Sequence, residues 1–304
     1  MMNTANASNI KIRKGTMITG KWHRRTYEVI KPIGSGAVGT VYLCKHHGQL
    51  VALKTSRRSL SMTAEVQVLK MLANEKVQDS RLGPYLFDVD DWMTDSGITY
   101  TFYVMEFIRG ITLQEYVKKN GLQQLVPLLR QLLLQLDKIH QLGYVFGDLK
   151  HENIIVTYGQ PTIRLIDVGG TTLLGRSVKE YTNFYDRAYW RLGTRVAEPS
   201  YDLFAVVMVV LTIFYPKQFT RTNGNSVDLL KRKIANMKQL RHLAPVLQKA
   251  ISGKYKRARQ MELAILSVRH RKRRHTRAIQ SYIIEGISIL MAMLIYVLIY
   301  FFYL

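Results

Sequence analysis

The chain has 304 residues, of which 47% are hydrophobic, and it carries a formal net charge of +23. These values exclude a small disulfide-stabilised domain and an intrinsically disordered chain, and they suit a folded core of about 250 residues with additional segments. The single cysteine, Cys44, cannot form an intramolecular disulfide, which favours a reducing compartment. Residues 1–20 are polar and basic, so we expect a flexible N-terminus without a secretory signal.

A glycine-rich turn lies between two predicted strands in the first part of the chain. Residues 34–41 read Gly-Ser-Gly-Ala-Val-Gly-Thr-Val, and a strand-like run follows directly. Because glycine has no Cβ, such a loop lets backbone N–H groups approach phosphate oxygens. A dinucleotide-binding fold would place a helix after this turn, so the strand favours a loop over the phosphates of ATP. The loop residues are Gly34, Ser35, Gly36, Ala37, Val38 and Gly39.

The next elements complete a small predicted lobe. A second strand ends at residues 51–54, which read Val-Ala-Leu-Lys. Residues 64–72 have the apolar spacing of a helix and contain Glu65, and residues 101–108 form an apolar strand that ends at a polar break. Apolar side chains at these positions suit a nucleotide pocket, and simple core packing would require them too.

The strongest chemical signal is a D-x-K-x-x-N motif that begins at Asp148 and a D-x-G motif that begins at Asp167. Phosphoryl transfer requires that a hydroxyl is aligned, that a metal is held and that developing charge is neutralised. Asp148 can orient and deprotonate the hydroxyl, and Lys150 can balance charge on the transferred group. Asn153 and Asp167 carry oxygen ligands of the kind that Mg²⁺ prefers. A turn with scattered polar residues would rarely place four such side chains at these separations.

On these motifs the chain resembles the eukaryotic-like (Hanks-type) Ser/Thr protein kinases of bacteria over roughly residues 27–265. The resemblance implies an α+β, two-lobed kinase fold, with a β-rich N-lobe at about 21–107 and a mainly helical C-lobe at about 108–268. It implies ATP and Mg²⁺ as cofactors and protein hydroxyls as acceptors. Lys54 would contact the α- and β-phosphates and pair with Glu65. The adenine pocket would be formed by Val41, Ala52, Met105, Glu106 and Ile108.

The chain departs from the kinase pattern in its catalytic loop, around Asp148, and in its activation segment, between Asp167 and Glu198. Gly147 stands where the family has an arginine that binds an activation-loop phosphate, so unusual regulation is expected. Thr194 fits the threonine of the substrate-docking loop and would bond the catalytic aspartate. Glu198 is expected to pair with Arg257. Asp202 fits the aspartate that opens the central helix of the C-lobe.

Positive charge is concentrated toward the end of the chain. Residues 217–280 contain only two acids among many lysines and arginines, and the densest basic run covers 269–277. Juxtamembrane basic residues are attracted to anionic lipids, whereas a basic face on a folded domain can bind nucleic-acid phosphates without any sequence motif. Three interpretations of the basic region therefore stay open: sequence-independent DNA binding, lipid contact and a merely solvated surface. The candidate contacts are Lys231, Arg232, Lys233, Lys238, Arg271, Lys272, Arg273 and Arg274.

The final segment is predicted to cross a membrane. Residues 286–304 contain no charged side chain, and as a helix they would span about 28 Å, close to the ~30 Å apolar thickness of a bilayer. The preceding basic run places the kinase domain in the cytoplasm by the positive-inside rule. We expect a basic juxtamembrane segment at 269–280 and one transmembrane helix at 281–304. This combination resembles the C-terminally anchored, YabT-type kinases of spore-forming bacteria.

The sequence therefore predicts an ATP-dependent Ser/Thr protein kinase on the cytoplasmic face of the cell membrane. It would act on cytosolic proteins, phosphorylate itself as a homodimer and be stimulated by DNA. The alternative is a membrane-anchored pseudokinase scaffold, supported by Gly147. A lipid or small-molecule kinase ranks third, because Lys150 is the form found in Ser/Thr protein kinases. The expected autophosphorylation sites are Thr171, Thr172, Ser177 and Thr182, or hydroxyls of the basic C-lobe.

Overall fold

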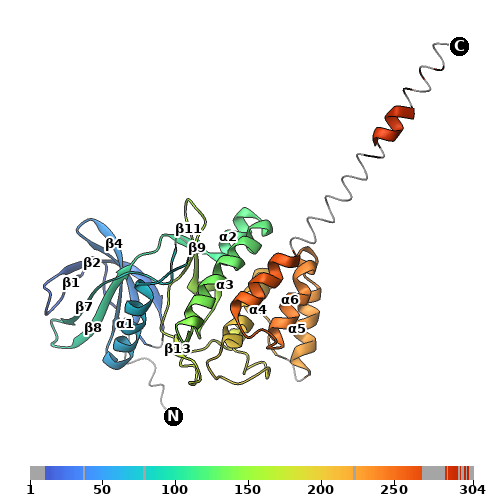
Figure 1. The fold of residues 1–304 in the computed structure, drawn as a ribbon. Helices are drawn as coiled ribbons and strands as arrows, with labels where there is room; N and C mark the ends of the chain where they lie inside the picture. The colour runs from blue at the N-terminus through green and yellow to red at the C-terminus, as the bar shows by residue number, and fades with distance from the viewer. Residues whose placement is uncertain are drawn as a thin grey trace.

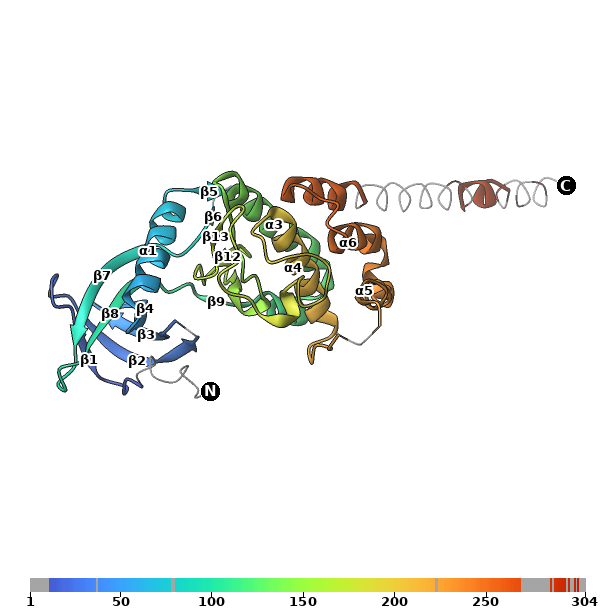
Figure 2. The ribbon, with the colours of Figure 1, turned by 90° about the horizontal axis from the view of Figure 1, so that it is seen from below.

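The structure is a computed structural model of the chain, and it describes residues 11–36, 38–77, 80–221, 224–268, 285, 287–293, 295, 298 and 300. Figure 1 shows strands gathered in one lobe and helices in the other, and Figure 2 shows the same division from below. The α+β, two-lobed kinase fold expected from the sequence is present.

The N-lobe is built on an antiparallel sheet of six strands in the order β1-β2-β3-β4-β8-β7. The strands are β1 (Met17–Thr19), β2 (Thr26–Ser35), β3 (Thr40–His46), β4 (Gln49–Ser56), β7 (Leu86–Met93) and β8 (Thr99–Glu106). Helix α1 (Ser59–Ala73) packs against β7 and β8 and buries one face that includes Glu65 and Leu69. This packing brings a carboxylate of α1 toward the central strands.

The sheet begins before the boundary predicted at residue 21. Strand β1 pairs with β2, and Ile18 is fully buried. Upstream, Ile12 is also buried, and its backbone N–H donates to the Tyr42 hydroxyl at 3.1 Å. The prediction of a flexible segment up to residue 20 is therefore wrong for residues 11–20, because Ile12, Ile18 and backbone hydrogen bonds to β2 dock them on the sheet. Residues 1–10 lie outside the described part.

The C-lobe is formed mainly by helices around one apolar helix. The helices are α2 (Leu113–Asn120), α3 (Leu125–Gln141), α4 (Pro199–Phe214), α5 (Ser226–Ala235) and α6 (Ala244–Ile251), and residues 258–268 are also helical. Helix α4 is apolar on all sides, as expected for a helix in a core, and its residues 200–212 are all buried. The other helices cover it with the apolar faces of amphipathic sequences.

Short strand pairs at the lobe junction position two loops. Strands β9 (Gly110–Thr112), β11 (Ile154–Thr157) and β12 (Ile163–Leu165) form one small sheet, and β10 (Tyr144–Val145) pairs with β13 (Thr172–Leu173). A further pair joins β5 (Lys76–Val77) to β6 (Ser80–Arg81). Because β10 and β11 flank residues 146–153 while β12 and β13 flank residues 166–171, the two motif-bearing loops lie side by side.

No helix within the described residues is both long and apolar enough to cross a bilayer. Most of the segment 281–304, and all of the basic run 269–277, lie outside the described residues. The transmembrane helix therefore stays a prediction.

Candidate active site

The catalytic loop is held in place by one buried carboxylate, which lies in the first turn of α4. Asp202 is fully buried and accepts hydrogen bonds from the backbone N–H groups of Phe146 at 2.8 Å and Gly147 at 3.0 Å. Its Oδ2 also lies 2.9 Å from Nε2 of the buried His140. The loop that carries Asp148 is thus attached to the most deeply buried helix of the C-lobe.

Gly147 has a structural reason to be glycine. Its φ is +83°, a conformation that L side chains rarely adopt, and a Cβ there would collide with the carbonyl oxygen of Gly170. In return, a Cβ on Gly170 would lie 2.8 Å from the backbone nitrogen of Asp148. The catalytic loop and the loop after Asp167 therefore meet backbone to backbone, closer than side chains at these positions would allow.

The D-x-K-x-x-N motif folds as a compact unit around Asp148. Lys150 Nζ lies 2.5 Å from Asp148 Oδ2, and the Thr182 hydroxyl donates to Oδ1 at 3.1 Å. Burial lowers the pKa of Lys150, but the hydrogen bond and charge of Asp148 outweigh it, so the pKa is raised and the ammonium stays protonated. The Asn153 side-chain amide donates to the backbone carbonyl of Asp148 at 2.9 Å. This bond turns the amide nitrogen of Asn153 inward and leaves its oxygen available to a cation.

The ion pair expected between Lys54 and Glu65 is present. Lys54 Nζ lies 2.7 Å from Glu65 Oε2 and 3.8 Å from Asp167 Oδ1, and both partners of the first pair are buried. Burial lowers the pKa of Lys54, but the charges of Asp167 and Glu65 outweigh it and the pKa is raised. Tyr103, which lies opposite Lys54 in β8, donates its hydroxyl to the same Oε2 at 2.8 Å. The sequence did not single out Tyr103, since an aromatic residue in a strand usually serves packing.

The glycine-rich loop has the close backbone approach expected of it. The Gly36 N–H donates to the Gly39 carbonyl at 2.9 Å, and a Cβ on Gly39 would collide with the Thr55 carbonyl. The Ser56 hydroxyl donates to the Val38 carbonyl, which ties the loop to the end of β4. Gly34 and Ser35 end β2, whereas Ala37 lies outside the described residues.

The apolar residues expected at the adenine pocket meet at the junction of the lobes. Val38, Ala52 and Met105 are buried in the cluster that also forms the C-lobe core, with Val41 packed against it. Ile108 follows β8 and is partly buried. These positions fit a pocket whose walls come from both lobes.

Glu106 has a contact that the sequence did not predict. Arg164 of β12 donates to both carboxylate oxygens of Glu106, at 2.7 and 3.1 Å, and to the Gly83 carbonyl at 2.9 Å. A bidentate guanidinium–carboxylate pair is geometrically specific. It connects β8, which ends at the junction of the lobes, to β12, the C-lobe strand that precedes Asp167.

Two expected contacts of the activation segment are wrong. The threonine bonded to Asp148 is Thr182, whereas the Thr194 carbonyl accepts from Arg187 Nε at 2.8 Å. Glu198 pairs with Arg187 at 2.6 Å rather than with Arg257. Residues 183–198 fold back on themselves, so that Arg187 contacts both the Thr194 carbonyl and the Glu198 carboxylate.

The basic face contains some exposed cations and some packed ones. Lys231 and Arg232 on α5 and the nearby Lys238 are exposed. The Lys233 ammonium lies 4.6 Å from the ring centroid of Tyr215 and 4.9 Å from that of Phe219, so this residue contributes to packing. The candidates Arg271, Lys272, Arg273 and Arg274 lie outside the described residues.

A protein-kinase family model, described as "Protein kinase domain", matches residues 27–282. The chain belongs to the protein kinase family. It is 44% identical over 268 residues to the serine/threonine-protein kinase YabT of Bacillus subtilis, covering 88% of this chain and 78% of that protein. It is therefore a protein-serine/threonine kinase and binds ATP.

More distant relatives agree with this placement. The serine/threonine-protein kinase PrkC of Bacillus subtilis is 27% identical over 173 residues, which cover 55% of this chain and 26% of PrkC. The crystal structure of the Mycobacterium tuberculosis PknI kinase domain superposes with a TM-score of 0.56 at 18% identity, covering 85% of this chain and 100% of that one. That likeness shows the fold alone.

The residues in the cleft fit the nucleotide and divalent metal that the family uses. Asp167 is 42% exposed at its side chain and so presents its carboxylate to the cleft. Asn153 keeps its side-chain oxygen free of the bond that its nitrogen makes. Hard divalent cations prefer such oxygen donors. Asn153 and Asp167 would hold the metal, and Lys54 would face the phosphates.

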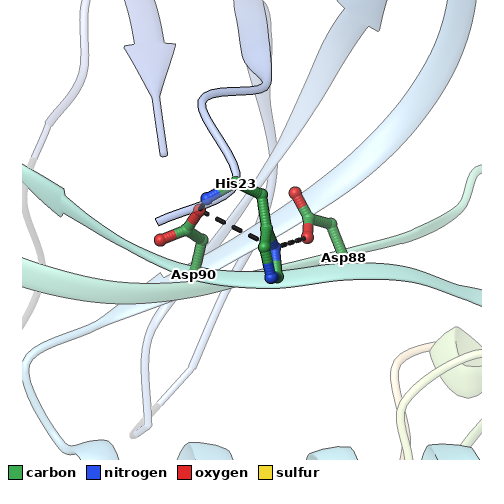
Figure 3. Close-up of side chains that lie close together, drawn as sticks. All are labelled: His23, Asp88 and Asp90. Carbon is green, nitrogen blue, oxygen red and sulfur yellow. Dashed lines mark hydrogen bonds and ion pairs between the residues drawn. The ribbon is translucent and has the colours of Figure 1, made fainter. Parts of the chain in front are cut away.

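A second group of potential metal ligands lies far from this cleft. His23 lies between Asp88 and Asp90, with Nδ1 at 2.7 Å from the former and 3.8 Å from the latter (Figure 3). Both carboxylates already have partners, since Asp90 accepts the backbone N–H groups of Trp22 and His23, and Asp88 accepts the Tyr27 hydroxyl at 2.7 Å. These bonds attach residues 20–25 to β7, which explains why the three side chains lie together.

The buried carboxylate of Asp202 predicts a large effect of its removal. In Asp202→Ala, the donors of Phe146, Gly147 and His140 lose their acceptor. Breaking a buried charged network of this kind costs roughly 3–5 kcal/mol, to be measured by urea denaturation. Because the loop that carries Asp148 loses its support, we also expect phosphotransfer to fall by about 100-fold.

The matched control for this prediction is Asp228→Ala. Asp228 is an exposed carboxylate in the first turn of α5, and its loss should cost less than about 1 kcal/mol. Equal stability of the two variants would contradict the anchoring role of Asp202.

Proposed function

We propose that the kinase acts at the cytoplasmic face of the cell membrane, uses Mg²⁺ with ATP, phosphorylates itself and is stimulated by DNA. The central support for catalysis is the joint presence of the Lys54–Glu65 pair and the bonds of Lys150 and Thr182 to Asp148. A pseudokinase would have no reason to keep both contact sets, so the scaffold alternative is disfavoured.

The proposed chemistry follows from these contacts. Asp148 accepts the proton of the acceptor hydroxyl. The hydroxyl oxygen bonds to the γ-phosphorus, and the bond between this phosphorus and ADP breaks. Lys150, 2.5 Å from Asp148, balances charge on the transferred group. Lys54 positions the α- and β-phosphates and is held by Glu65. Bound Mg²⁺ supplies neutralisation of the phosphate charge.

The assignment of Asp148 is tested by Asp148→Asn. We expect transfer of label from ATP, to the chain itself and to an added basic protein, to fall by at least about 100-fold, since general-base catalysis contributes 10²–10⁴-fold. Nucleotide affinity should stay within about threefold, because Lys54, Asn153 and Asp167 are unchanged. Binding of a fluorescent ATP analogue provides the second measurement.

Asp95→Asn is the matched control, because Asp95 is an exposed carboxylate in the hairpin between β7 and β8. This variant should keep the parent turnover. If Asp148→Asn turns over as fast as Asp95→Asn, the assignment of the base is incorrect.

Autophosphorylation is proposed at Ser177. Of the four hydroxyls expected in the activation segment, Thr171 and Thr172 are buried and Thr182 is bonded to Asp148, whereas Ser177 is exposed. Since Gly147 replaces the arginine that binds an activation-loop phosphate in the family, a phosphate on Ser177 has no partner at that position.

Membrane attachment through residues 281–304 is supported by the absence of charge from 286 onward and by the exposure of apolar side chains. Ile287, Leu290, Met293 and Tyr300 are each between 59% and 71% exposed. A row of exposed large apolar residues is costly in water and favourable in a bilayer.

Deletion of residues 281–304 is expected to move the kinase from the membrane fraction to the soluble fraction. The apolar segment supplies the anchoring free energy, whereas basic contacts to lipid headgroups are screened by salt. The measurement is fractionation of expressing cells, with the membranes washed in about 1 M salt, where the Debye length is only about 3 Å. Full retention of the truncated chain in washed membranes would refute the anchor.

DNA binding is proposed for the face that carries Lys231, Arg232 and Lys238, all of which are exposed on the folded domain. These cations belong to the soluble lobe, and a lipid anchor does not require them. Phosphate contacts of this kind are independent of sequence. Two kinase molecules on one DNA would come close enough to phosphorylate each other.

Replacing Lys231, Arg232 and Lys238 together by glutamate should weaken binding of duplex DNA to residues 1–280. Because each cation that contacts phosphate adds close to one unit to the log–log dependence on salt, we expect the slope between 50 and 200 mM salt to become shallower by about 3. Fluorescence anisotropy measures affinity and slope.

The control is the same charge change on the N-lobe, with Lys14, Lys31 and Lys45 replaced by glutamate, since these side chains are exposed as well. An equal loss in both triple variants would mean that net charge alone is responsible. Absence of binding by the parent at low salt would leave lipid as the partner of the basic region.

A further inference from the structure

A third carboxylate reaches the metal side of the cleft from the activation segment. A Cβ built on Gly169 would lie 3.2 Å from Glu65 Oε1, 3.3 Å from Asp167 Oδ1 and 3.5 Å from Glu180 Oε2. Three carboxylate oxygens from α1, from the D-x-G motif and from the activation segment are therefore neighbours of Gly169. Motif spacing gave no reason to single out Glu180.

One of these oxygens is buried and has no partner. Glu65 is only 4% exposed, and its Oε2 receives both Lys54 and Tyr103. Its Oε1 is fully buried, accepts no hydrogen bond and lies beside Gly169, as Asp167 and Glu180 do. A buried carboxylate oxygen without a donor is costly, so this position calls for a water or a cation.

The charges of this region do not balance. Lys54 is the cation that faces Glu65, Asp167 and Glu180, and all three act on its pKa. Lys150 is already paired with Asp148. With the carboxylates ionised, the group around Lys54 keeps two uncompensated negative charges, which is the charge of one divalent cation. Burial and the charge of Asp167 raise the pKa of Glu180, as expected for a carboxylate crowded by others.

Residues on both sides of Glu180 are held by bonds of their side chains. Thr182 donates to Asp148 at 3.1 Å, and the Lys179 ammonium donates to the Thr171 carbonyl at 3.2 Å. Among the described residues the Glu180 side chain has no hydrogen-bond or ion-pair partner, so it is free to turn. The oxygens of Glu65, Asp167 and Glu180 do not all lie within 4.8 Å of one another, so a cation would have to draw Glu180 toward Asp167.

We propose that Glu180 is a further carboxylate of the metal site, which joins Asp167 in binding the divalent cation and so attaches the activation segment to it. The inference rests on the proposed use of Mg²⁺, with Asn153 and Asp167 as the other ligands. Metal binding and ordering of residues 179–182 would then be coupled, without the arginine that Gly147 replaces.

The test uses the full chain in detergent with Mn²⁺ as the probe and a non-hydrolysable ATP analogue, so that no turnover is needed. Electron paramagnetic resonance of free Mn²⁺ gives the affinity. We expect Glu180→Gln to weaken Mn²⁺ binding at least tenfold and Glu180→Asp, which keeps the carboxylate, to weaken it less. In the parent, Mn²⁺ should also slow cleavage by trypsin after the exposed Lys179. Glu180→Gln should lose this protection.

Asp95→Asn is the matched control, because Asp95 is an exposed carboxylate in the hairpin between β7 and β8, outside both motif-bearing loops. It should bind Mn²⁺ as the parent does. Parent-like or tighter Mn²⁺ binding by Glu180→Gln would overturn the proposal, since tighter binding would show that Glu180 competes with the phosphates. Asp167→Asn distinguishes failure of the Glu180 proposal from failure of the metal site itself. If this variant too leaves Mn²⁺ affinity unchanged, the metal site of the proposed function is wrong as well.

Discussion

The active site depends on a negative charge buried at the start of an apolar helix. Burying a carboxylate is unfavourable unless donors replace its water, and Asp202 obtains them from Phe146, Gly147 and His140. The same bonds determine where residues 146–148 lie relative to α4. The C-lobe core thus helps to set the position of Asp148.

Electrostatic balance links the lobes in a similar way. Lys54 from the N-lobe sheet is attracted both to Glu65 on α1 and to Asp167, which follows a C-lobe strand. Arg164 and Glu106 form a second link beside the hinge. Buried charges of this kind are stable only when paired, so the cleft favours one arrangement of its walls. The negative surplus near Glu180 is what a divalent cation would neutralise.

The contact between Gly147 and Gly170 explains a departure from the kinase pattern. The two glycines let the loops that carry Asp148 and Asp167 touch through their backbones. An arginine at position 147 would need both a strained backbone and displacement of the Gly170 carbonyl. Thr182 instead gives the activation segment its own bond to Asp148, independent of a phosphate bound at position 147.

The sequence by itself determined the family, the two lobes and the partners within short motifs. Asp148 and Asn153 could be assigned because they share one short motif, and Lys54 and Glu65 because the resemblance to protein kinases implies their pairing. The tertiary structure decided the contacts that join distant or irregular segments. The path of residues 170–198 decides which threonine bonds Asp148, which arginine pairs with Glu198 and that Glu180 lies beside Gly169. That path has little periodicity to read, because it is fixed by backbone bonds and by buried charges from other elements.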